Sequence, residues 1–242
     1  MTDFSTRNTD AELMDNPSVD ANMLRKVFED INRSNRMLGG NGLTINSAAK
    51  LIADHPQESY TILDMGCGDG TMLRKLVLWG RKQKISIVGI GIDLSEKGLA
   101  IAKEKSQDFP EISYLRQDIL KLDPDDLGCD ILLCTLTMHH FLNREIPVFL
   151  KQFEKLAHIG FIINDLQRSA LSYYLFKVFS LIFIRTKIAK HDGLISIQSG
   201  FTKSELRAFS KNLSSARHEI RWKWAFRYVW VMETERLKGV YE

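Results

Sequence analysis

The sequence has little cysteine. Only three cysteines occur among 242 residues, Cys67, Cys129 and Cys134, with an odd total and no CxxC pair. This pattern excludes a framework of paired disulfides and the common cysteine-based zinc sites. We expect reduced thiols and a cytoplasmic location.

Neither sign of charge dominates. The chain has 33 basic and 30 acidic residues, a net charge of +3 that is too small to favour a nucleic-acid partner. The charges are uneven, since residues 1–24 contain five acids and one arginine, and residues 168–190 contain five bases and no acid. We interpret the first segment as a solvated tail and the second as a mildly basic surface.

Long hydrophobic runs are also missing. The N-terminus lacks the basic region followed by an apolar region that is typical of a secretory signal. The most apolar stretch, 169–184, has 16 residues with Lys177 in its middle, whereas a membrane span needs about 20. We therefore expect no stable membrane insertion. Core, homodimer face and substrate lid are the alternative interpretations of this stretch.

What the sequence does have is an alternation of strand and helix patterns. Near-continuous apolar strands separated by helices predict a parallel sheet covered on both faces. Towards the C-terminus, two strand patterns with a reversal near Ala225–Phe226 predict an antiparallel hairpin. We therefore predict a doubly wound α/β sheet, mostly parallel and seven-stranded. The parallel strand patterns cover 60–65, 85–93, 112–116, 129–135 and 160–165, and the helical patterns lie near 70–80, 95–106 and 143–158.

Two helices are expected before this sheet. The first covers 20–38, with Asp20 as N-cap and with Gly39, Gly40 and Gly42 ending it, and the second covers roughly 44–54. We expect residues 1–55 to form an N-terminal tail and helical cap. Residues 56–242 are then the main domain, with a helical lid insertion at about 168–203.

Glycine is concentrated behind the first strand, in the stretch "DMGCGDG" from Asp64 to Gly70. The spacing G-x-G-x-G differs from the dinucleotide pattern G-x-G-x-x-G, because Thr71 stands where its last glycine would be. Asp64 and Asp69 would repel a pyrophosphate and attract an ammonium group. The alternative is a tight turn with no ligand.

Acids also end the next two strands. Asp93 follows the second strand, where a carboxylate can bind both hydroxyls of a ribose, and Asp118 follows the third, where it suits the exocyclic amine of a purine. One such acid alone would more often be a helix N-cap. Three acids at successive strand ends are much more specific, because ligands bind at this edge of parallel sheets.

This set of motifs resembles the class I S-adenosylmethionine-dependent methyltransferases, with their Rossmann-like fold, over roughly residues 60–165. "LDMGCGDG" matches the first motif of that family, and "CDILLCTLTMHHF" resembles the fourth, which lines the methionine moiety and the substrate. The "HHF" and the N-terminal helices look like small-molecule methyltransferases of the ubiquinone/menaquinone type. The resemblance implies S-adenosyl-L-methionine as cofactor, held by Asp64, Gly66, Cys67, Gly68, Gly70, Asp93, Leu94, Asp118, Ile119, Thr135 and Leu136.

Two histidines follow the fourth strand, near the expected methyl group. An imidazole with a pKa near about 6.5 suits a base that removes a hydroxyl proton at neutral pH, so His139 and His140 are the candidate catalytic residues; packing and capping are the alternative. The fourth strand ends in Cys134-Thr135 without an acid, so we expect no required metal. The expected acceptor-binding residues are Asp165, Arg168, Tyr173 and His191.

We therefore expect methylation of a hydroxyl on a small aromatic or otherwise apolar acceptor. C- or N-methylation of a small metabolite and non-catalytic cofactor binding remain alternatives, because a fold does not determine a function. Aminopropyl transfer is disfavoured, because "TLTMHHF" offers no acid to a polyamine. The sequence does not identify the acceptor.

Overall fold

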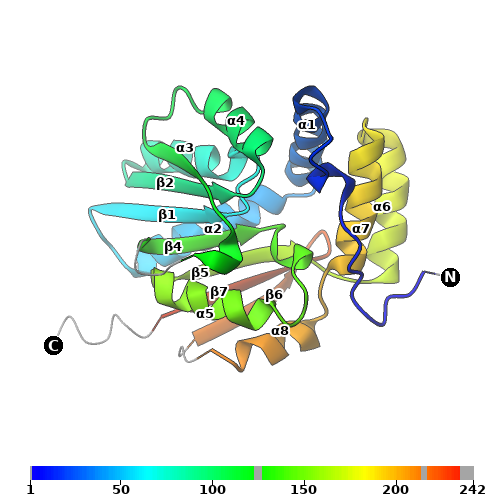
Figure 1. Cartoon of the computed structure of the whole chain (residues 1–242). Coiled ribbons are helices and arrows are strands. Elements are labelled where there is room, and N and C mark those ends of the chain that lie inside the picture. Colours follow the sequence, from blue (N-terminus) through cyan, green and yellow to red (C-terminus); the bar gives the residue numbers. More distant parts are fainter. Residues whose placement is uncertain (1, 123–126, 214–216, 235–242) are drawn as a thin grey trace.

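The computed structural model describes residues 2–122, 127–213 and 217–234, and its centre is a seven-stranded sheet (Figure 1). The strand order is β3-β2-β1-β4-β5-β7-β6, with β1 to β5 parallel and β7 antiparallel to both β5 and β6. This confirms the predicted fold. The strands are β1 Ser59–Met65, β2 Ser86–Asp93, β3 Ile112–Arg116, β4 Cys129–Thr135, β5 Ala157–Leu166, β6 Arg217–Lys223 and β7 Arg227–Glu233.

The carboxyl ends of the parallel strands meet at one edge of the sheet. In the register, Asp64 of β1 lies between Gly91 of β2 and Leu133 of β4. The chain order reverses at β1, because β2 and β3 lie on one side of it and β4 and β5 on the other. Such a switch point is where open parallel sheets bind ligands.

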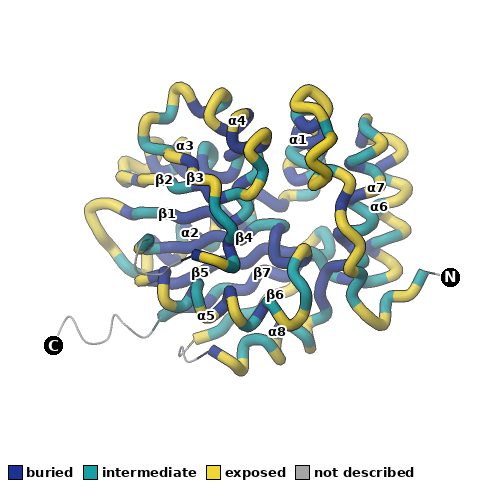
Figure 2. The backbone as a smooth tube through the Cα atoms, viewed as in Figure 1, coloured by how far each residue is buried: buried dark blue, intermediate teal, exposed yellow. Residues whose placement is uncertain are grey.

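Helices cover both faces of the sheet. One face carries α2 (Gly40–Asp54), α3 (Thr71–Gln83) and α4 (Glu96–Lys105), and the other carries α5 (Ile146–Leu156) and α8 (Lys203–Ser210). Each interface has its own apolar cluster, the first around Leu73 and Leu76 and the second around Phe149 and Phe153. The inner strands β1, β4, β5 and β7 are largely buried, and the edge strands β3 and β6 are more exposed (Figure 2).

A third group of helices lies at the carboxyl end of the strands. It consists of α1 (Ala21–Met37), α6 (Ala170–Phe183) and α7 (Lys187–Ser199), which stand beside one another (Figure 1). Helix α7 also contacts two short 3-10 turns, η1 (Leu13–Asp15) and η3 (Met138–His140), and a third turn, η2 (Ile119–Lys121), follows β3. Segments from before β1 and after β5 therefore cover the strand ends together.

Helix α1 begins as predicted, because the Asp20 side chain accepts hydrogen bonds from the backbone N–H groups of the first turn. The prediction for its end was partly wrong. Gly39 alone adopts a left-handed conformation (φ 73°), which reverses the chain. Gly40 and Gly42 already belong to α2, which starts four residues before the predicted boundary.

The N-terminal segment is not the solvated tail that its charges predict. The Arg7 guanidinium donates hydrogen bonds to the carbonyls of Ser199 (2.7 Å) and His139 (2.8 Å). The Asp192 carboxylate of α7 accepts the backbone N–H groups of Leu13 and Met14, both at 2.9 Å. The segment is therefore bound across the strand ends.

The apolar stretch 169–184 forms α6, and its side chains divide between two faces. Phe179 packs towards Val27 of α1 and Ala189 of α7. The opposite face is 47–71% exposed and consists of Leu171, Tyr174, Leu175, Val178, Leu181 and Ile182. Within the described ranges, no helix has the length and apolarity to cross a membrane.

Asp30 of α1 connects this helix to the start of α7. Its side chain is 1% exposed, and Oδ2 accepts the backbone N–H groups of Arg185 (3.0 Å) and Thr186 (2.7 Å) and the Thr186 hydroxyl (2.9 Å). Replacement by alanine removes the acceptor of these partly buried donors.

We predict that Asp30→Ala lowers the free energy of unfolding by about 2–4 kcal/mol, because it removes three hydrogen bonds that contribute about 0.5–1.5 kcal/mol each. Urea unfolding followed by circular dichroism measures this loss. Glu29→Ala is the matched control, because Glu29 is the exposed neighbour on α1 and should change stability by less than about 0.5 kcal/mol. Equal stability of the two variants would contradict the prediction.

Candidate active site

The glycine loop after β1 folds back onto β2. The backbone N–H groups of Gly66 and Cys67 both donate to the Ile92 carbonyl, at 2.8 and 3.0 Å. Gly66, Gly68 and Gly70 all have positive φ angles, of 72°, 53° and 73°, which glycine adopts without steric cost. The loop therefore needs these glycines for its own shape.

Side chains also crowd the loop glycines. A Cβ atom at Gly66 would overlap the Thr137 side chain, and one at Gly68 would lie 3.1 Å from the Phe28 ring of α1. A branched residue at position 66 would thus clash within the protein before it met a ligand. Substitution of Gly66 is therefore a poor test of ligand binding.

Asp93, at the end of β2, holds the loop from the other side. Its Oδ2 atom accepts the Gly68 N–H at 2.8 Å and its Oδ1 atom accepts the Ser95 N–H at 2.8 Å. Burial raises the pKa of Asp93 although these hydrogen bonds oppose the shift. The next side chain, Leu94, is 61% exposed at the same edge, so a carboxylate and an apolar surface stand side by side.

Asp64 is the acid of this site that lacks a partner. Its residue is 2% exposed, and none of the hydrogen bonds between described residues ends on its carboxylate. Burial, and then the charge of Asp93, raise the pKa of Asp64 to about 8. A buried carboxyl group without a donor is costly, and a cationic ligand would satisfy it.

Asp69, unlike Asp64, has partners within the protein, although the sequence predicts that both acids attract an ammonium group. Its carboxylate accepts hydrogen bonds from the Lys105 ammonium (2.8 Å), the Asn32 amide (3.0 Å) and the Thr71 backbone N–H (3.2 Å). The protein therefore neutralises Asp69 itself. Its role is to hold α1, α3 and α4 together around the loop.

Asp118 and Ile119 follow β3 at the same edge. The Asp118 Oδ1 atom accepts the Leu120 N–H at 3.0 Å and so caps η2. This is the capping role that the sequence left open, and the half-buried carboxylate keeps its Oδ2 atom 3.5 Å from the Lys121 ammonium. Ile119 is 7% exposed.

The end of β4 brings the remaining predicted residues. The Thr135 hydroxyl lies 3.3 Å from that of Thr44 in α2. Leu136 has a left-handed backbone (φ 55°), unusual for a residue with a side chain, and donates its N–H to the Asn164 carbonyl. Strained residues of this kind concentrate at functional sites.

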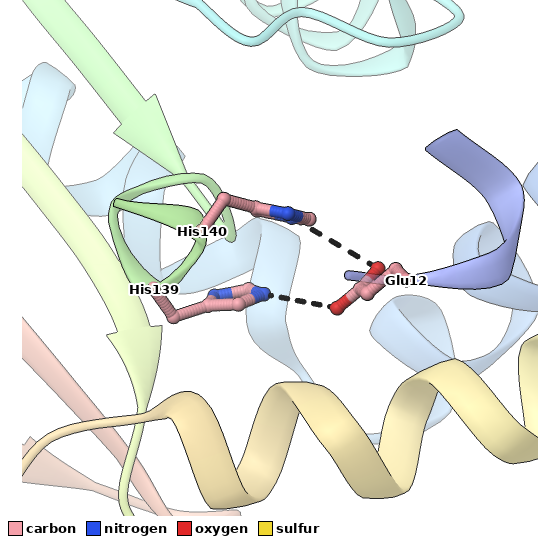
Figure 3. A group of neighbouring side chains, drawn as sticks. All are labelled: Glu12, His139 and His140. Carbon is pink, nitrogen blue, oxygen red and sulfur yellow. Dashed lines mark ion pairs between the residues drawn. The ribbon is translucent and has the colours of Figure 1, made fainter. Parts of the chain in front are cut away.

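His139 is held rigidly in η3. Its Nδ1 atom lies 2.6 Å from Asp165 Oδ1, and its backbone N–H donates to Asp165 Oδ2 at 3.1 Å. Its Nε2 atom faces Glu12 Oε1 at 3.5 Å and has no hydrogen-bond partner (Figure 3). Burial opposes the charged ring, but Asp165 and Glu12 raise the pKa of His139 to about 10. In this state the imidazole keeps its proton at neutral pH and cannot act as a base.

His140 is the more accessible of the two histidines. Its ring stacks on that of His139 with the centroids 4.5 Å apart. Its Nε2 atom lies 3.9 Å from Glu12 Oε2, its Nδ1 atom lies 3.4 Å from Asp15 Oδ2, and 32% of the side chain is exposed. Of the predicted pair, only His140 presents its ring to a ligand.

Asp165 and Arg168 are expected from the sequence to bind the acceptor. In the structure both side chains are buried and bonded to other parts of the protein. Asp165 is 1% exposed and orients His139 from behind. Arg168 is 4% exposed, forms an ion pair with Glu205 (2.7 Å) and donates to the Gly200 carbonyl (2.6 Å). Both side chains belong to internal networks, so we no longer assign them to the acceptor.

Among the described residues, neither Tyr173 nor His191 forms a ring contact, hydrogen bond or ion pair with the histidine pair. Tyr173 packs against Phe4, with the ring centroids 5.5 Å apart. The His191 Nδ1 atom lies 3.0 Å from Asp192, and 49% of its side chain is exposed. Their contact with an acceptor stays a prediction.

Glu12 and Asp15 were missed by sequence reasoning. Both come from the acid-rich segment that looked like a solvated tail, yet Glu12 is only 7% exposed and also accepts a hydrogen bond from Ser196 of α7. The charges of His139 and His140 and the hydrogen bond from Ser196 hold the pKa of Glu12 below its usual value although burial opposes them. No local pattern marks these two residues, because their partners are distant in the sequence.

The three cysteines take no part in this cluster. All are buried and unpaired, as the sequence predicted. Burial raises the pKa of each thiol, to about 12 for Cys129. Such thiols are poor nucleophiles and metal ligands.

Comparison with known proteins agrees with this geometry. Residues 62–160 match a family described as "Methyltransferase domain". Carboxy-S-adenosyl-L-methionine synthase of Desulfotalea psychrophila is 32% identical over 104 residues, which are 42% of this chain and 42% of that protein. A putative 23S rRNA (guanine-N(1)-)-methyltransferase of Bacillus subtilis is 32% identical over 103 residues, 40% of this chain and 35% of that protein. The chain thus matches less than half the length of these relatives.

The likeness to a solved structure extends further along the chain. The plantazolicin methyltransferase BpumL, in complex with SAH, superposes with a TM-score of 0.66, covering 91% of each chain at 16% identity. At this identity the superposition shows the fold. Together with the match over 62–160, it agrees with the resemblance seen in the sequence: a segment of the chain is similar to a methyltransferase domain, and the chain has the fold of this methyltransferase structure.

Proposed function

We propose that the protein binds S-adenosylmethionine at the carboxyl edge of its sheet and transfers the methyl group to a hydroxyl of a small acceptor. The observation that carries this proposal is Asp64, a buried carboxyl group with a raised pKa and no hydrogen-bond donor, beside a glycine loop. A cofactor that carries an ammonium group supplies the missing partner. The complex of BpumL with SAH, the demethylated cofactor, supports this choice.

The residues at the edge fit the other parts of this cofactor. Asp93 has both carboxylate oxygens anchored by backbone N–H groups, and each oxygen keeps a lone pair for a ribose hydroxyl. The exposed Leu94 offers an apolar surface to a purine ring, and the Asp118 carboxylate would accept a hydrogen bond from the exocyclic amine of that ring. Gly66, Cys67, Gly68, Gly70, Ile119, Thr135 and Leu136 would line the same site.

The chemistry divides between the cofactor and the histidine pair. When bound, the cofactor supplies a methyl group that its sulfonium already activates. His140 accepts the proton of the acceptor hydroxyl, since His139 keeps its own proton between Asp165 and Glu12. A positioned base of this kind contributes about 100- to 10,000-fold to the rate.

The acceptor reaches His140 from the side covered by α7 and the N-terminal segment. Helix α7 contacts both η1 and η3, whereas α6 packs on α7 and α1. From the sequence, the stretch 169–184, which forms α6, is a candidate for a substrate lid. We assign the lid to α7 instead, with α6 packed behind it. The division into a cap (1–55), a main domain (56–242) and an insertion (168–203) stays a prediction, as does a homodimer through α6.

An apolar or aromatic acceptor remains the preferred class. The two arginines near the site already interact within the protein. Arg7 donates hydrogen bonds to two carbonyls, and Arg168 forms an ion pair with Glu205. The net charge of +3 also offers little to a polyanion. An rRNA acceptor, which the name of the Bacillus subtilis relative suggests, is tested beside phenols and amines by measuring SAH formation. Turnover of rRNA alone would overturn the small-molecule proposal.

Asp93→Ala should weaken binding of S-adenosylmethionine and SAH by about 1.5–3 kcal/mol, the usual contribution of a charge-assisted hydrogen bond. Isothermal titration calorimetry measures the change. Asp108→Ala removes the same side chain from an exposed position and should bind like the wild type. Wild-type affinity in the Asp93 variant would count against the ribose assignment.

Asp64→Asn should change stability and binding in opposite directions. An unfolded Asp has a pKa near about 3.9, so the folded protein, with a pKa of about 8, binds the extra proton between these values. The resulting stability is fully present below about pH 4 and is lost as the pH rises through 8. The asparagine variant cannot ionise, so its stability relative to the wild type should increase from pH 5 to pH 8.

Thermal unfolding of the ligand-free proteins at both pH values measures this effect, and calorimetry should show weaker cofactor binding to the same variant. A difference in stability that is constant with pH, combined with unchanged binding, would refute the role of Asp64.

His140→Ala should lower turnover at saturating substrates by at least about 100-fold while it leaves cofactor affinity unchanged. Single-turnover kinetics with a hydroxyl acceptor separates the two quantities. His158→Ala removes an exposed imidazole at the opposite end of β5 and is the control. Treatment with a chelator should not reduce activity. Unchanged turnover in the His140 variant would exclude this residue as the base.

A further inference from the structure

Both histidines of η3 present the same nitrogen atom to one carboxylate. The Nε2 atom of His139 lies 3.5 Å from Glu12 Oε1, and that of His140 lies 3.9 Å from Glu12 Oε2 (Figure 3). One ligand atom from each residue falls within 4.8 Å of the others. Two imidazoles and one carboxylate with this spacing form a familiar set of metal ligands.

Each ring is also supported from behind by a second carboxylate. Asp165 holds Nδ1 of His139 at 2.6 Å, and Asp15 lies 3.4 Å from Nδ1 of His140. Metal-binding histidines usually donate their second N–H group to a carboxylate, which fixes the ring and leaves the other nitrogen free for the ion. Here both histidines have this arrangement.

The Nε2 atom of His139 supplies an independent observation. Its side chain is 3% exposed, yet this nitrogen has no hydrogen-bond partner and points at the space between Glu12 and His140. Most buried polar atoms are satisfied. This unsatisfied nitrogen faces the other two candidate ligands, Glu12 and His140.

From this geometry we infer that Glu12, His139 and His140 bind one divalent transition-metal ion, with Asp165 and Asp15 orienting the two rings. The ion displaces the Nε2 proton of His139, which is released to solvent. Ligand atoms at about 2.0–2.1 Å from a tetrahedral ion lie about 3.3 Å apart. The two nitrogens lie 3.5 and 3.9 Å from different oxygens of Glu12, and one ligand atom from each residue lies within 4.8 Å of the others. The three side chains must therefore move together by up to about 1.5 Å to bind one ion. Imidazole nitrogens favour Zn²⁺, Co²⁺ or Ni²⁺, whereas Mg²⁺ prefers a full set of oxygens.

Such an ion would fasten the N-terminal segment over the acceptor site. Glu12 comes from that segment, and the histidines come from the end of β4, so one ion links the two. The ion also occupies the lone pair of His140 that the proposed proton transfer uses, and metal binding therefore opposes turnover. The inference rests on the ligand geometry and does not require methyl transfer.

Titration of tag-free, chelator-treated protein with Zn²⁺ and Co²⁺, without cofactor or acceptor, tests the site. We expect one ion per chain by calorimetry and visible absorption typical of four- or five-coordinate Co²⁺. His140→Ala and Glu12→Gln should each weaken binding at least about 100-fold, and Asp15→Asn about 10-fold. His158 is an exposed histidine at the opposite end of β5. The control variant His158→Ala should bind the metal like the wild type.

Hydrogen exchange provides a second measurement. Zn²⁺ should slow exchange of the backbone amides of residues 9–16 in the wild type and not in His140→Ala. Circular dichroism and SAH binding confirm that each variant is folded, so a loss of metal affinity cannot come from unfolding.

Absence of saturable binding by the wild type, or equal losses in His158→Ala and His140→Ala, would overturn the metal site. Either result with SAH affinity intact would leave the proposed function standing. Failure of SAH binding alongside intact metal binding would refute only the proposed function.

Discussion

The structure of the site depends on the buried pair of Asp165 and His139. Asp165 ends β5, and its carboxylate binds both the ring and the backbone N–H of His139. This fixes η3 against the sheet and directs Nε2 of His139 at Glu12. Because a buried charge that loses its partner costs several kcal/mol, each of the three residues stabilises the positions of the other two. The N-terminal segment is thereby tied to the central sheet through side chains distant in the sequence.

Three aspartates near the strand ends have different roles because their hydrogen-bond and ion-pair partners differ. Asp69 is paired with Lys105 and serves the packing of three helices. Asp93 accepts two backbone N–H groups and orders the glycine loop. Asp64 has neither a cation nor a donor within the described residues, and its pKa is correspondingly raised. Of the three acids, Asp64 is the one that lacks a partner within the described residues. We therefore assign the ammonium group of a ligand to it.

The sequence predicted those features that short-range patterns determine. The bounds of β3 and β4 agree with their apolar runs, and Asp20 caps α1 as its spacing indicated. Features that depend on distant partners were not predictable. Glu12 looked like one acid in a charged tail, and Arg168 looked free because Glu205 lies far along the chain. The two faces of α6 could not be separated either, because its apolar residues surround the helix and only the position of α7 decides which of them are buried.

The same contacts that close the acceptor site also determine how it can open. Apart from Glu12, the N-terminal segment is attached by hydrogen bonds that Arg7 donates to two carbonyls and that the Leu13 and Met14 N–H groups donate to Asp192. Of the two apolar clusters of the sheet, the one around Phe149 and Phe153 reaches the segment at Phe201, whose ring centroid lies 4.3 Å from the Arg7 guanidinium. Water replaces the hydrogen bonds at a small net cost, typically about 0.5–1.5 kcal/mol each. Displacement of the segment is therefore a local event, and the charge on the His139–Glu12 contact is the main term that resists it.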